Sequence, residues 1–393
     1  MTHESVHNST SLIDSIMGES LTTLLKTSGV LRTGISDTFE CLIGTGNKYG
    51  ARLSKHASPL PLLFAITQTV SVNSWRLLKS LLLMQSCSSS VFDVPIFIRP
   101  QKTESISSIE AIYFSRANGS MVVVETETIQ KIYFRAIPKS KISLCIQAAA
   151  SKHTRMIPPI TVDETNGLLL ASFPRYRPVH VGKAESLALL DIAISETSDT
   201  LQKVDPDLSA ALTIYNQISW WWDSVEGNIN HELRKKTFQV CEQYVSMLEQ
   251  EKIPCHFLQH GDFWPENILF TPEPVVIDFD SLLRCPKHYD AVYYILSVIL
   301  YSGRLTLPEL MDTKSPPHNK AAVEDCRRIV QLQQITSVDW VACENLFLLL
   351  KFAFCFTHNS IYSGKEMAIL EKLSTRFDRF PKESSWVSST LGF

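Results

Sequence analysis

The stretch LQHGDFWPENILFTPEPVVIDFDSLLRCPKHYDA, residues 258–291, contains two short apolar runs, at 267–270 and 275–278. Both runs are rich in residues that favour β-strands. The four residues between them, Thr-Pro-Glu-Pro, include two prolines, which suit a turn and cannot serve a central strand. The stretch therefore predicts a β-hairpin.

A four-residue turn sets the pairing of the two strands in this hairpin. It places Phe270 opposite Val275 and, counting back along both strands, Asn267 opposite Asp278. Directly opposed residues hold their β-carbons roughly 4.5–5.5 Å apart, so an amide oxygen and a carboxylate are expected side by side. Mg²⁺ prefers oxygen ligands and is usually held by one or two protein groups together with substrate phosphates and water. Asp262, on a His-Gly-Asp turn ahead of the hairpin, adds a third oxygen donor.

Seven residues of this stretch form one compound pattern with fixed spacing. In chain order they are His260, Gly261, Asp262, Asn267, Asp278, Asp280 and Asp290. The pattern resembles the aminoglycoside phosphotransferase and choline kinase family, whose members are small-molecule kinases with a protein-kinase-like fold. A compound pattern is more specific than any single short motif. The competing interpretation is an ordinary acidic hairpin at the surface of a domain.

The resemblance implies a role for five of these residues. Asp262 would orient and deprotonate the hydroxyl of an acceptor molecule. Asn267 and Asp278 would hold Mg²⁺ on the phosphates of the nucleotide. His260 would buttress the catalytic loop, and Asp290 would pin that loop through its backbone.

Composition and charge narrow the class of protein. The 393 residues are 45% hydrophobic and 20% charged, which is ordinary for a globular chain with a sizeable core. A net charge of −3 gives no field that attracts nucleic acid, so we expect no nucleic-acid partner. Nine cysteines without a Cys-x-x-Cys pair indicate reduced thiols rather than disulfides or a zinc site. The longest apolar runs, at 291–301 and 346–356, are too short to span a membrane, and no secretory signal is visible, so we expect a cytoplasmic protein with no membrane partner.

Residues 1–104 are predicted to be an N-terminal extension that is mostly helical. Apolar residues at helical spacing predict helices at 12–25 and 72–84. The glycines at 43–50 fit no phosphate-binding motif, because no strand with a lysine follows them, and a plain turn is favoured. The role of the extension is left open between covering the nucleotide-binding lobe, forming a homodimer and contacting another partner.

Residues 105–178 are predicted to form the nucleotide-binding N-lobe and the hinge. The apolar runs predict strands at 109–114, 121–125, 128–134, 160–163 and 168–172. An Asn-Gly turn joins the first two, and together the strands predict a small antiparallel sheet. The resemblance implies that Lys131, in the third strand, contacts the α- and β-phosphates. Gln147, in a helix expected at 142–153, stands where the family places a glutamate paired with that lysine, and its neutral amide supplies no countercharge.

The hinge between the lobes is expected at 173–178. Adenine commonly stacks on this segment in related folds, so Phe173 and Tyr176 are candidate lining residues, with simple packing as the alternative. ATP is the expected nucleotide. GTP is left open, because the sequence defines the hinge only loosely.

Residues 179–393 are predicted to form the catalytic and acceptor-binding C-lobe. Apolar residues at helical spacing indicate helices from residue 182 onward, with later ones near 291–301, 320–335, 340–358 and 364–378. The Trp220-Trp221-Trp222 cluster either walls an acceptor pocket or packs in the core. The expected fold class is α+β: a bilobal protein-kinase-like fold with a small antiparallel N-lobe, a helical C-lobe and the N-terminal extension.

The expected function is ATP- and Mg²⁺-dependent phosphoryl transfer to a hydroxyl of a small polar molecule, of the aminoglycoside, amino alcohol or sugar type. Such transfer asks the protein mainly for positioning and for stabilising charge. Asp280 is left open between a second ion, the acceptor and a structural role. The alternative is a weak or silent pseudokinase that binds a nucleotide and serves as a regulator or scaffold. Gln147 favours this alternative, whereas the intact Asp262, Asn267 and Asp278 disfavour it.

Two further alternatives are weaker. A macromolecular substrate is disfavoured because the segment between Asp278 and Asp290 is too short for a long activation segment. A metal hydrolase built on His256, His260 and the nearby aspartates is disfavoured, because the surrounding glycine and prolines make a helix there doubtful.

Overall fold

The computed structural model describes the chain in segments. They are residues 39–42, 97–100, 109–115, 120–125, 127–133, 138–165, 168–177, 179, 181–223, 230–303, 311, 320–358, 365–381, 386–391 and 393. The helices predicted at 12–25 and 72–84 lie outside the described residues, as do the turns predicted at 43–50 and 117–119. The described part of the N-terminal extension is two short antiparallel strands, β1 (Phe39–Leu42) and β2 (Phe97–Pro100).

The chain divides into two compact units. The first comprises residues 1–138 and 160–175, and the second comprises 139–159 and 176–393. The two are described separately below. The domain boundaries predicted at 104 and 178 stay predictions.

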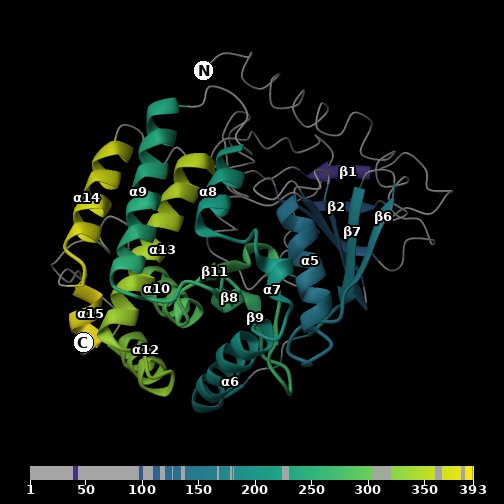
Figure 1. The fold of residues 1–393 in the computed structure, drawn as a ribbon. Coiled ribbons are helices and arrows are strands. Elements are labelled where there is room, and N and C mark those ends of the chain that lie inside the picture. Colours follow the sequence, from purple (N-terminus) through teal and green to yellow (C-terminus); the bar gives the residue numbers. More distant parts are fainter. Residues whose placement is uncertain are drawn as a thin grey trace, which may run out of the picture. The chain divides into compact units, whose positions relative to one another are not determined.

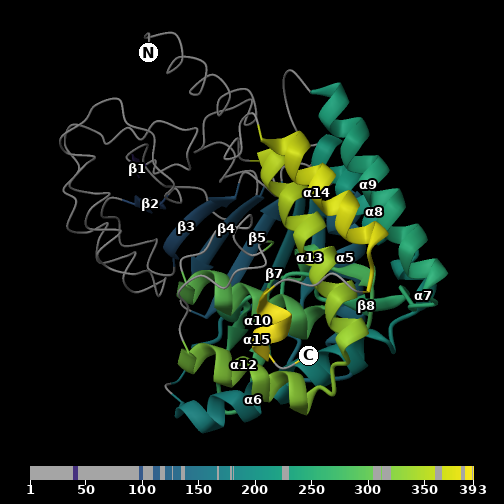
Figure 2. The same cartoon turned by 90° about the vertical axis from the view of Figure 1, so that its left-hand side faces the viewer.

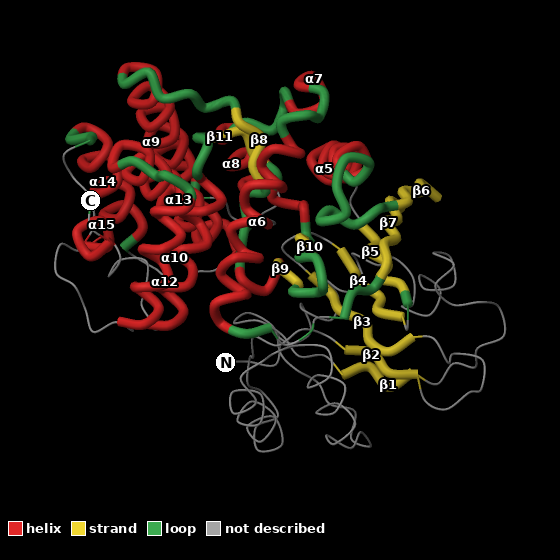
Figure 3. The backbone as a smooth tube through the Cα atoms, turned by 90° about the horizontal axis from the view of Figure 1, so that it is seen from below, coloured by secondary structure: helices red, strands yellow, loops and turns green. Residues whose placement is uncertain are grey.

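The first unit contains a five-stranded antiparallel sheet with the order β3-β4-β5-β7-β6 (Figure 3). Its strands are β3 (Ile109–Ser115), β4 (Ser120–Glu125), β5 (Thr128–Tyr133), β6 (Thr161–Thr165) and β7 (Leu168–Pro174). Each predicted strand is thereby confirmed to within about three residues at its ends. The central strand β5 pairs with β4 on one side and with β7 on the other. Lys131 consequently sits in mid-sheet, opposite Val122 and Ala171.

The second unit is mainly helical (Figure 1). Its helices are α5 (Pro138–Ala150, from Lys139 on), α6 (Lys183–Leu201), α7 (Pro206–Ser209), α8 (Ile214–Asp223), α9 (His231–Gln250), α10 (Tyr289–Gly303), α12 (Lys320–Leu332), α13 (Ser337–His358), α14 (Glu366–Asp378) and α15 (Trp386–Leu391). The helices predicted near 291–301, 320–335, 340–358 and 364–378 are confirmed. Together with the sheet of the first unit, they confirm the predicted α+β class.

Helix α13 lies at the centre of this unit. It begins at a capping box in which Thr336 and Asp339 each accept the other's backbone N–H, at 3.2 and 3.3 Å. Every residue from Trp340 to Leu350 is buried, since α13 packs against α8, α9, α10 and α14. Figure 2 shows α14 running alongside α13 and α9. An apolar helix of this kind is stable only when its whole circumference is covered.

A frame of short strands positions the central stretch of the sequence. These strands are β8 (Phe257–Gln259), β9 (Ile268–Leu269), β10 (Val275–Val276) and β11 (Leu283–Cys285). β8 pairs with β11 and β9 pairs with β10, both antiparallel. The side chain of Gln202 anchors β8 by donating to the carbonyl of Leu258 (2.7 Å) and accepting its N–H (3.2 Å). The loop at 260–267 therefore leaves a strand that is fixed on both sides.

Among the described residues, no helix combines the length and the apolar character that crossing a membrane requires.

Candidate active site

Asp290 holds the loop that carries Asp262. Its two carboxylate oxygens accept the backbone N–H groups of His260 (2.8 Å) and Gly261 (2.9 Å). Asp290 is buried in the first turn of α10, and burial raises its pKa, while the His260 ring and the two backbone donors act in the opposite direction. The position of the loop backbone is thus tied to a buried helix.

Gly261 is required by the backbone of this loop. Its φ of +80° lies in the left-handed region that side chains rarely adopt. A β-carbon at this position would lie 2.0 Å from the carbonyl oxygen of Ser281. The close approach of the two segments leaves room only for glycine.

The ring of His260 joins the loop to the second half of the site. Its Nε2 lies 2.9 Å from the carbonyl oxygen of Ile277, and a carbonyl only accepts, so Nε2 carries the proton. Nδ1 then accepts the backbone N–H of Asp262 at 3.4 Å. The ring is fully buried and makes edge contacts with Phe263 and Phe279. These are the contacts expected of a residue that supports the loop.

The predicted hairpin exists, but its predicted register is wrong. Leu269 pairs with Val275 rather than with Val276, and the backbone N–H of Ile277 donates to the carbonyl of Asn267 (2.9 Å). Asn267 therefore lies beside Ile277 rather than opposite Asp278. The turn contains five residues, 270–274, because Phe270 leaves the ladder.

A contact from outside the hairpin explains why Phe270 leaves the ladder. The carbonyl of Phe270 accepts the backbone N–H of Val179 at 2.7 Å. The other strand is also held from outside, since Val276 donates to the carbonyl of Met156 at 2.8 Å. Tertiary hydrogen bonds thus set the register of this short ladder.

Asn267 and Asp278 offer the oxygen atoms for a cation. The amide nitrogen of Asn267 donates to the carbonyl of Asp262 (2.9 Å), which leaves Oδ1 as its metal-binding atom. Asp278 is exposed and has φ 63° and ψ 62°, a left-handed conformation that costs free energy for a residue with a side chain. This conformation ends the strand and turns the chain into the short 3-10 helix at Phe279–Ser281. Amide and carboxylate oxygens fit Mg²⁺, which commonly takes one or two protein groups.

The described residues hold no group of three or more His, Cys, Asp or Glu side chains arranged around one metal position. The carboxylates of this region act on a buried lysine. Lys139, in the first turn of α5, is buried and donates a hydrogen bond to Oε1 of Gln217. Burial lowers the pKa of Lys139 to about 8, and the charges of Asp280, Asp262 and Asp278 oppose that shift. The three carboxylates thus favour the charged form of Lys139.

The Asp262 side chain also contacts residues of α10 and α13. The hydroxyl of Tyr293 donates a hydrogen bond to Oδ1 of Asp262. Lys351 donates to the Tyr293 oxygen, and its Nζ lies 3.7 Å from the same Oδ1. Burial and the neighbouring carboxylate raise the pKa of Tyr293 well above its usual value, so the phenol stays protonated and remains a donor.

The other residues predicted for nucleotide binding lie in different surroundings. Lys131 is buried in β5, with Nζ 5.5 Å from the centre of the Tyr133 ring. Phe173 lies within strand β7 and pairs with Ile129, so the predicted hinge at 173–178 begins too early. Gln147, in the second unit, donates from Nε2 to the carbonyl of Pro158 at 3.5 Å.

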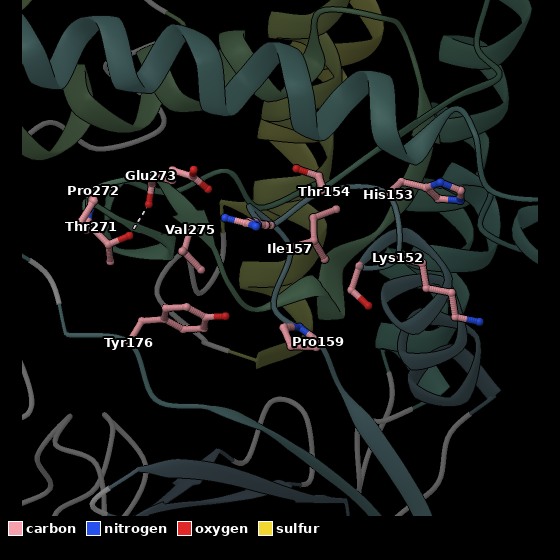
Figure 4. A pocket seen from close by; sticks show the side chains of 12 residues that line it. Lys152, His153, Thr154, Ile157, Pro159, Tyr176, Thr271, Pro272, Glu273 and Val275 are labelled. Atoms are coloured by element: carbon pink, nitrogen blue, oxygen red, sulfur yellow. Dashed lines mark hydrogen bonds between the residues drawn. The ribbon is translucent and has the colours of Figure 1, made fainter.

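Tyr176 lines a cavity of about 740 Å³ in the second unit (Figure 4). Figure 4 shows its ring reaching into the cavity from one side and Pro159 and Ile157 facing it from the other. Burial raises the pKa of the Tyr176 phenol. The volume suits a small molecule. The lining includes none of Asp262, Asn267 and Asp278, and it consists of Ser151, Lys152, His153, Thr154, Arg155, Ile157, Pro159, Tyr176, Thr271, Pro272, Glu273 and Val275.

The tryptophan cluster lies in α8. Trp222 is buried, and Trp220 and Trp221 are partly buried against the same core. Trp221 packs edge-on against Phe354 of α13, with ring centres 5.4 Å apart. These contacts favour the packing interpretation over a pocket wall.

Comparison with known proteins agrees with the pattern in the central stretch. A family model described as the phosphotransferase enzyme family matches residues 227–308. The predicted resemblance is confirmed there. The matched residues make up about a fifth of the chain and include every residue from His260 to Asp290 discussed above. No curated protein sequence matches the chain.

Solved structures of small-molecule kinases are also similar to this chain. One is amicoumacin kinase hAmiN in complex with AMP-PNP, Ca²⁺ and Ami, with 15% identity, a TM-score of 0.45, and coverage of 71% of this chain and 88% of that chain. A choline/ethanolamine kinase family protein from Mesorhizobium loti has 12% identity, a TM-score of 0.41, and coverage of 69% and 89%. Plasmodium vivax ethanolamine kinase has 14% identity, a TM-score of 0.42, and coverage of 70% and 81%.

Three residues of the site were not predicted from the sequence: Lys139, Tyr293 and Lys351. Lys351 had a visible signal, because it is a single charge inside the apolar run at 346–356, and buried charges need partners. Lys139 and Tyr293 had none. They reach Asp262 or its neighbours only through the packing of α5 and α10.

Proposed function

We propose that this protein is an ATP- and Mg²⁺-dependent phosphotransferase that acts on a hydroxyl of a small polar molecule. The observation that carries the proposal is the way Asp262 is held. Its loop is pinned by Asp290, and its carbonyl receives the Asn267 amide. The Asp262 carboxylate, the Asn267 side-chain oxygen and the exposed Asp278 are thereby kept on one short segment. The family match over the same segment supports this reading.

The proposed chemistry uses Asp262 as the group that receives the proton. The acceptor hydroxyl donates a hydrogen bond to Oδ2 of Asp262, because Tyr293 already donates to Oδ1. Bond formation between the acceptor oxygen and the γ-phosphorus accompanies cleavage of the bond to the β-phosphate oxygen, and the hydroxyl proton passes to Asp262. The phosphorylated acceptor and ADP leave. Most of the rate enhancement in such transfers comes from positioning and charge.

Asn267 and Asp278 are the proposed Mg²⁺ ligands. These two residues would hold the ion, which would supply positive charge to offset the negative charge of the phosphates. Oδ1 of Asn267 is oriented for this by the hydrogen bond from its amide nitrogen. Asp280 acts on Lys139 together with Asp278, so it contributes charge to the same region.

The remaining nucleotide contacts are proposed for residues outside this segment. Lys131 in β5 is proposed to contact the α- and β-phosphates, with Gln147 as its neutral partner. Phe173 and Tyr176 are proposed to contact the base, and GTP stays open as an alternative to ATP. The proposed acceptor is a small molecule, and a homodimer through residues 1–104 stays a prediction.

One observation favours a second candidate, a pseudokinase that binds a nucleotide and acts as a regulator or scaffold. Gln147 lacks the negative charge expected at its position, and its amide donates to the carbonyl of Pro158. A neutral amide can accept a hydrogen bond from an ammonium but supplies no negative charge. Retention of Asp262, Asn267 and Asp278 opposes this candidate.

The testing experiment is thermal unfolding with ATP, with and without Mg²⁺. Wild-type protein should show a rise in Tm that requires both, because a ligand that binds only the folded state stabilises it. Asp278→Ala should lose the Mg²⁺-dependent part of the rise. Glu251→Ala is the control, because Glu251 is an exposed acidic residue at the end of α9 and does not line the cavity beside Tyr176. It should behave like wild type.

Turnover then separates the two candidates. ADP release with a panel of hydroxylated small molecules should be detectable in wild type and absent in Asp262→Asn, which should still bind Mg²⁺-ATP. Mg²⁺-dependent binding without ADP release for any acceptor would favour the pseudokinase. No Tm rise under any nucleotide and metal condition would refute both.

A further inference from the structure

Lys351 is surrounded by aromatic rings. Its Nζ lies 4.5 Å from the centre of the Tyr293 ring, 5.8 Å from that of Phe347 and 5.9 Å from that of Trp264. These distances fall in the range of favourable cation–π contacts. Tyr293 and Phe347 also pack edge-on, with ring centres 5.2 Å apart. The three rings therefore form an aromatic cage whose occupant is a side chain of this protein.

The cage lies directly beside Asp262. The Lys351 ammonium is 3.7 Å from Oδ1 of Asp262. Trp264 follows Asp262 by two residues, and the backbone N–H of Trp264 donates to the carbonyl of Asp262 at 2.7 Å. A hydroxyl that approaches Oδ2 of Asp262 consequently arrives next to a positive charge. A group on the neighbouring carbon of such an acceptor would therefore lie near that charge.

The Lys351 ammonium is able to bind a further group. An ammonium has three N–H donors, and among the described residues its hydrogen-bond acceptor is the Tyr293 oxygen. The side chain of Lys351 is 30% exposed, and that of Asp262 is 35% exposed. The remaining N–H groups of this partly exposed cation can donate to a carboxylate or another anionic group. Hydrogen bonds between charged groups of this kind are short and strong.

We propose that Lys351 determines the class of acceptor: the hydroxyl compound phosphorylated here carries an anionic group beside the reacting hydroxyl, and cationic amines are rejected. This rests on the proposed phosphotransferase function. The anionic group accepts hydrogen bonds from Lys351 while the hydroxyl faces Asp262. A protonated amine meets a cage that is already filled and a like charge at short range, which disfavours its binding. Of the three acceptor types expected from the sequence, the amino alcohols and aminoglycosides are disfavoured.

The first test asks which ions reach the cage, and it needs no turnover. Iodide and caesium ions both quench tryptophan fluorescence. The part of the fluorescence that is absent in Trp264→Phe comes from Trp264 and therefore reports on the cage. In wild type, iodide should quench this component more strongly than caesium does. Lys351→Met keeps the aliphatic stem against the rings and removes the charge, so the preference should disappear or reverse. Lys235→Met, at an exposed lysine of α9, should leave the preference unchanged.

The second test compares three acceptors of the same skeleton. Glucuronate, glucose and glucosamine, the last at a pH where its amine is protonated, are anionic, neutral and cationic. Wild-type kcat/KM from ADP release should fall in that order, with about tenfold or more between the first and the last. Lys351→Met should narrow or invert the order. When no sugar is turned over, the quenching preference decides.

Either of two results with the wild-type protein would overturn the proposal: caesium quenching the Trp264 component at least as well as iodide, or glucosamine being the best of the three sugars. An order that Lys351→Met leaves unchanged would overturn it as well. The phosphotransferase function fails separately, through the absence of any Mg²⁺-dependent rise in Tm with ATP.

Discussion

The hydroxyl of Tyr293 donates a hydrogen bond to Oδ1 of Asp262. One oxygen of the proposed catalytic carboxylate is thus engaged by a phenol whose raised pKa keeps it protonated. The bond fixes the rotation of the carboxylate and directs the other oxygen toward the acceptor. Orientation of this kind is what a buried helix such as α10 can provide and an exposed loop cannot.

Tyr293→Phe should lower kcat by about tenfold, because the carboxylate loses its fixed orientation. The ring and its packing stay, so Tm should change little. Steady-state kinetics of ADP release measures the first effect, and thermal unfolding measures the second.

Tyr289→Phe is the matched control for this change. Tyr289 is a buried tyrosine one helical turn earlier, and its hydroxyl has no hydrogen-bond partner among the described residues. Removal of an unpaired buried hydroxyl should stabilise the fold by about 1 kcal/mol and leave kcat unchanged. Equal kinetics for the two variants would argue against a role for the Tyr293 hydroxyl.

Gly261→Ala should strongly destabilise the loop that carries Asp262. The added methyl group would overlap the Ser281 carbonyl, and the backbone has φ +80°. Either the loop moves away from Asp290 or the protein unfolds more easily, and in both cases activity should fall by more than about 100-fold, since a displacement of about 1 Å has that effect. The measurements are urea unfolding and ADP release.

Gly182→Ala provides the comparison. Gly182 precedes α6, has φ −66°, and has no heavy atom within 4 Å of the position of a β-carbon. The substitution should cost at most about 1 kcal/mol and keep the activity. A loss of activity similar to that of Gly261→Ala would show that the effect is not specific to the loop.

Lys139 makes the stability of the protein depend on pH in alkaline solution. Burial lowers its pKa from 10.5 to about 8. Between these two values the unfolded chain binds more protons than the folded chain, so the Lys139 contribution to the free energy of unfolding rises with pH. It is absent below pH 8 and complete above pH 10.5, and it amounts to about 3 kcal/mol.

The measurement is the difference in free energy of unfolding between wild type and Lys139→Met, without metal, from pH 7 to 10.5. This difference should shift by about 3 kcal/mol in favour of wild type. Using the difference removes the titration of the buried tyrosines and cysteines, which both proteins share. Lys141→Met, at an exposed lysine of the same helix, should give a flat difference. A flat difference for Lys139→Met would mean that this ammonium is solvated.

Arg376 forms a buried ion pair with Glu344 in the helical unit. Nη2 lies 2.7 Å from Oε2 of Glu344, Nε lies 3.0 Å from Oδ1 of Asn345, and the Arg376 and Glu344 side chains are at most 3% exposed. Arg376→Met leaves the Glu344 charge buried without this partner, which should cost about 3–5 kcal/mol in the free energy of unfolding. Urea unfolding at pH 7 checks this value.

An exposed ion pair serves as the control for the buried one. Glu324→Gln removes the charge from a pair with Arg327 at 3.0 Å, in which both side chains are more than 40% exposed. The change should be at most about 1 kcal/mol. A result for Arg376→Met in the same small range would show that Glu344 is not held by this pair.

The sequence predicted the residues of the central stretch and most of the elements around it. Strand and helix patterns were readable because apolar periodicity is a local property. The hairpin register was not readable, since it depends on the hydrogen bond between Val179 and Phe270, residues that are far apart in the chain. The left-handed backbone of Asp278 was equally hidden, because residues with a side chain rarely adopt a positive φ and no glycine marks the position.

Some partners of Asp262 were predictable from the sequence, and others depend on how the helices pack. The resemblance implied that Asp290 holds the loop through its backbone, and its hydrogen bonds to the loop are present. Tyr293 and Lys351 lie on two different helices, and only the packing of α10 against α13 brings them to Asp262. A sequence shows that a lysine interrupts an apolar helix. It does not show which carboxylate that lysine faces.

The pairing of β8 with β11 has a consequence for how this chain tolerates changes in length. The two strands enclose the segment from His260 to Leu282, so both ends of that segment are fixed in register. An added or deleted residue in 260–267 would shift Asp262 away from its helix partners. At Pro272 and Glu273 the hairpin tip is exposed. Changes in length at this tip should therefore leave the position of Asp262 intact and alter only the cavity that the tip lines, whereas the same changes a few residues earlier should displace Asp262.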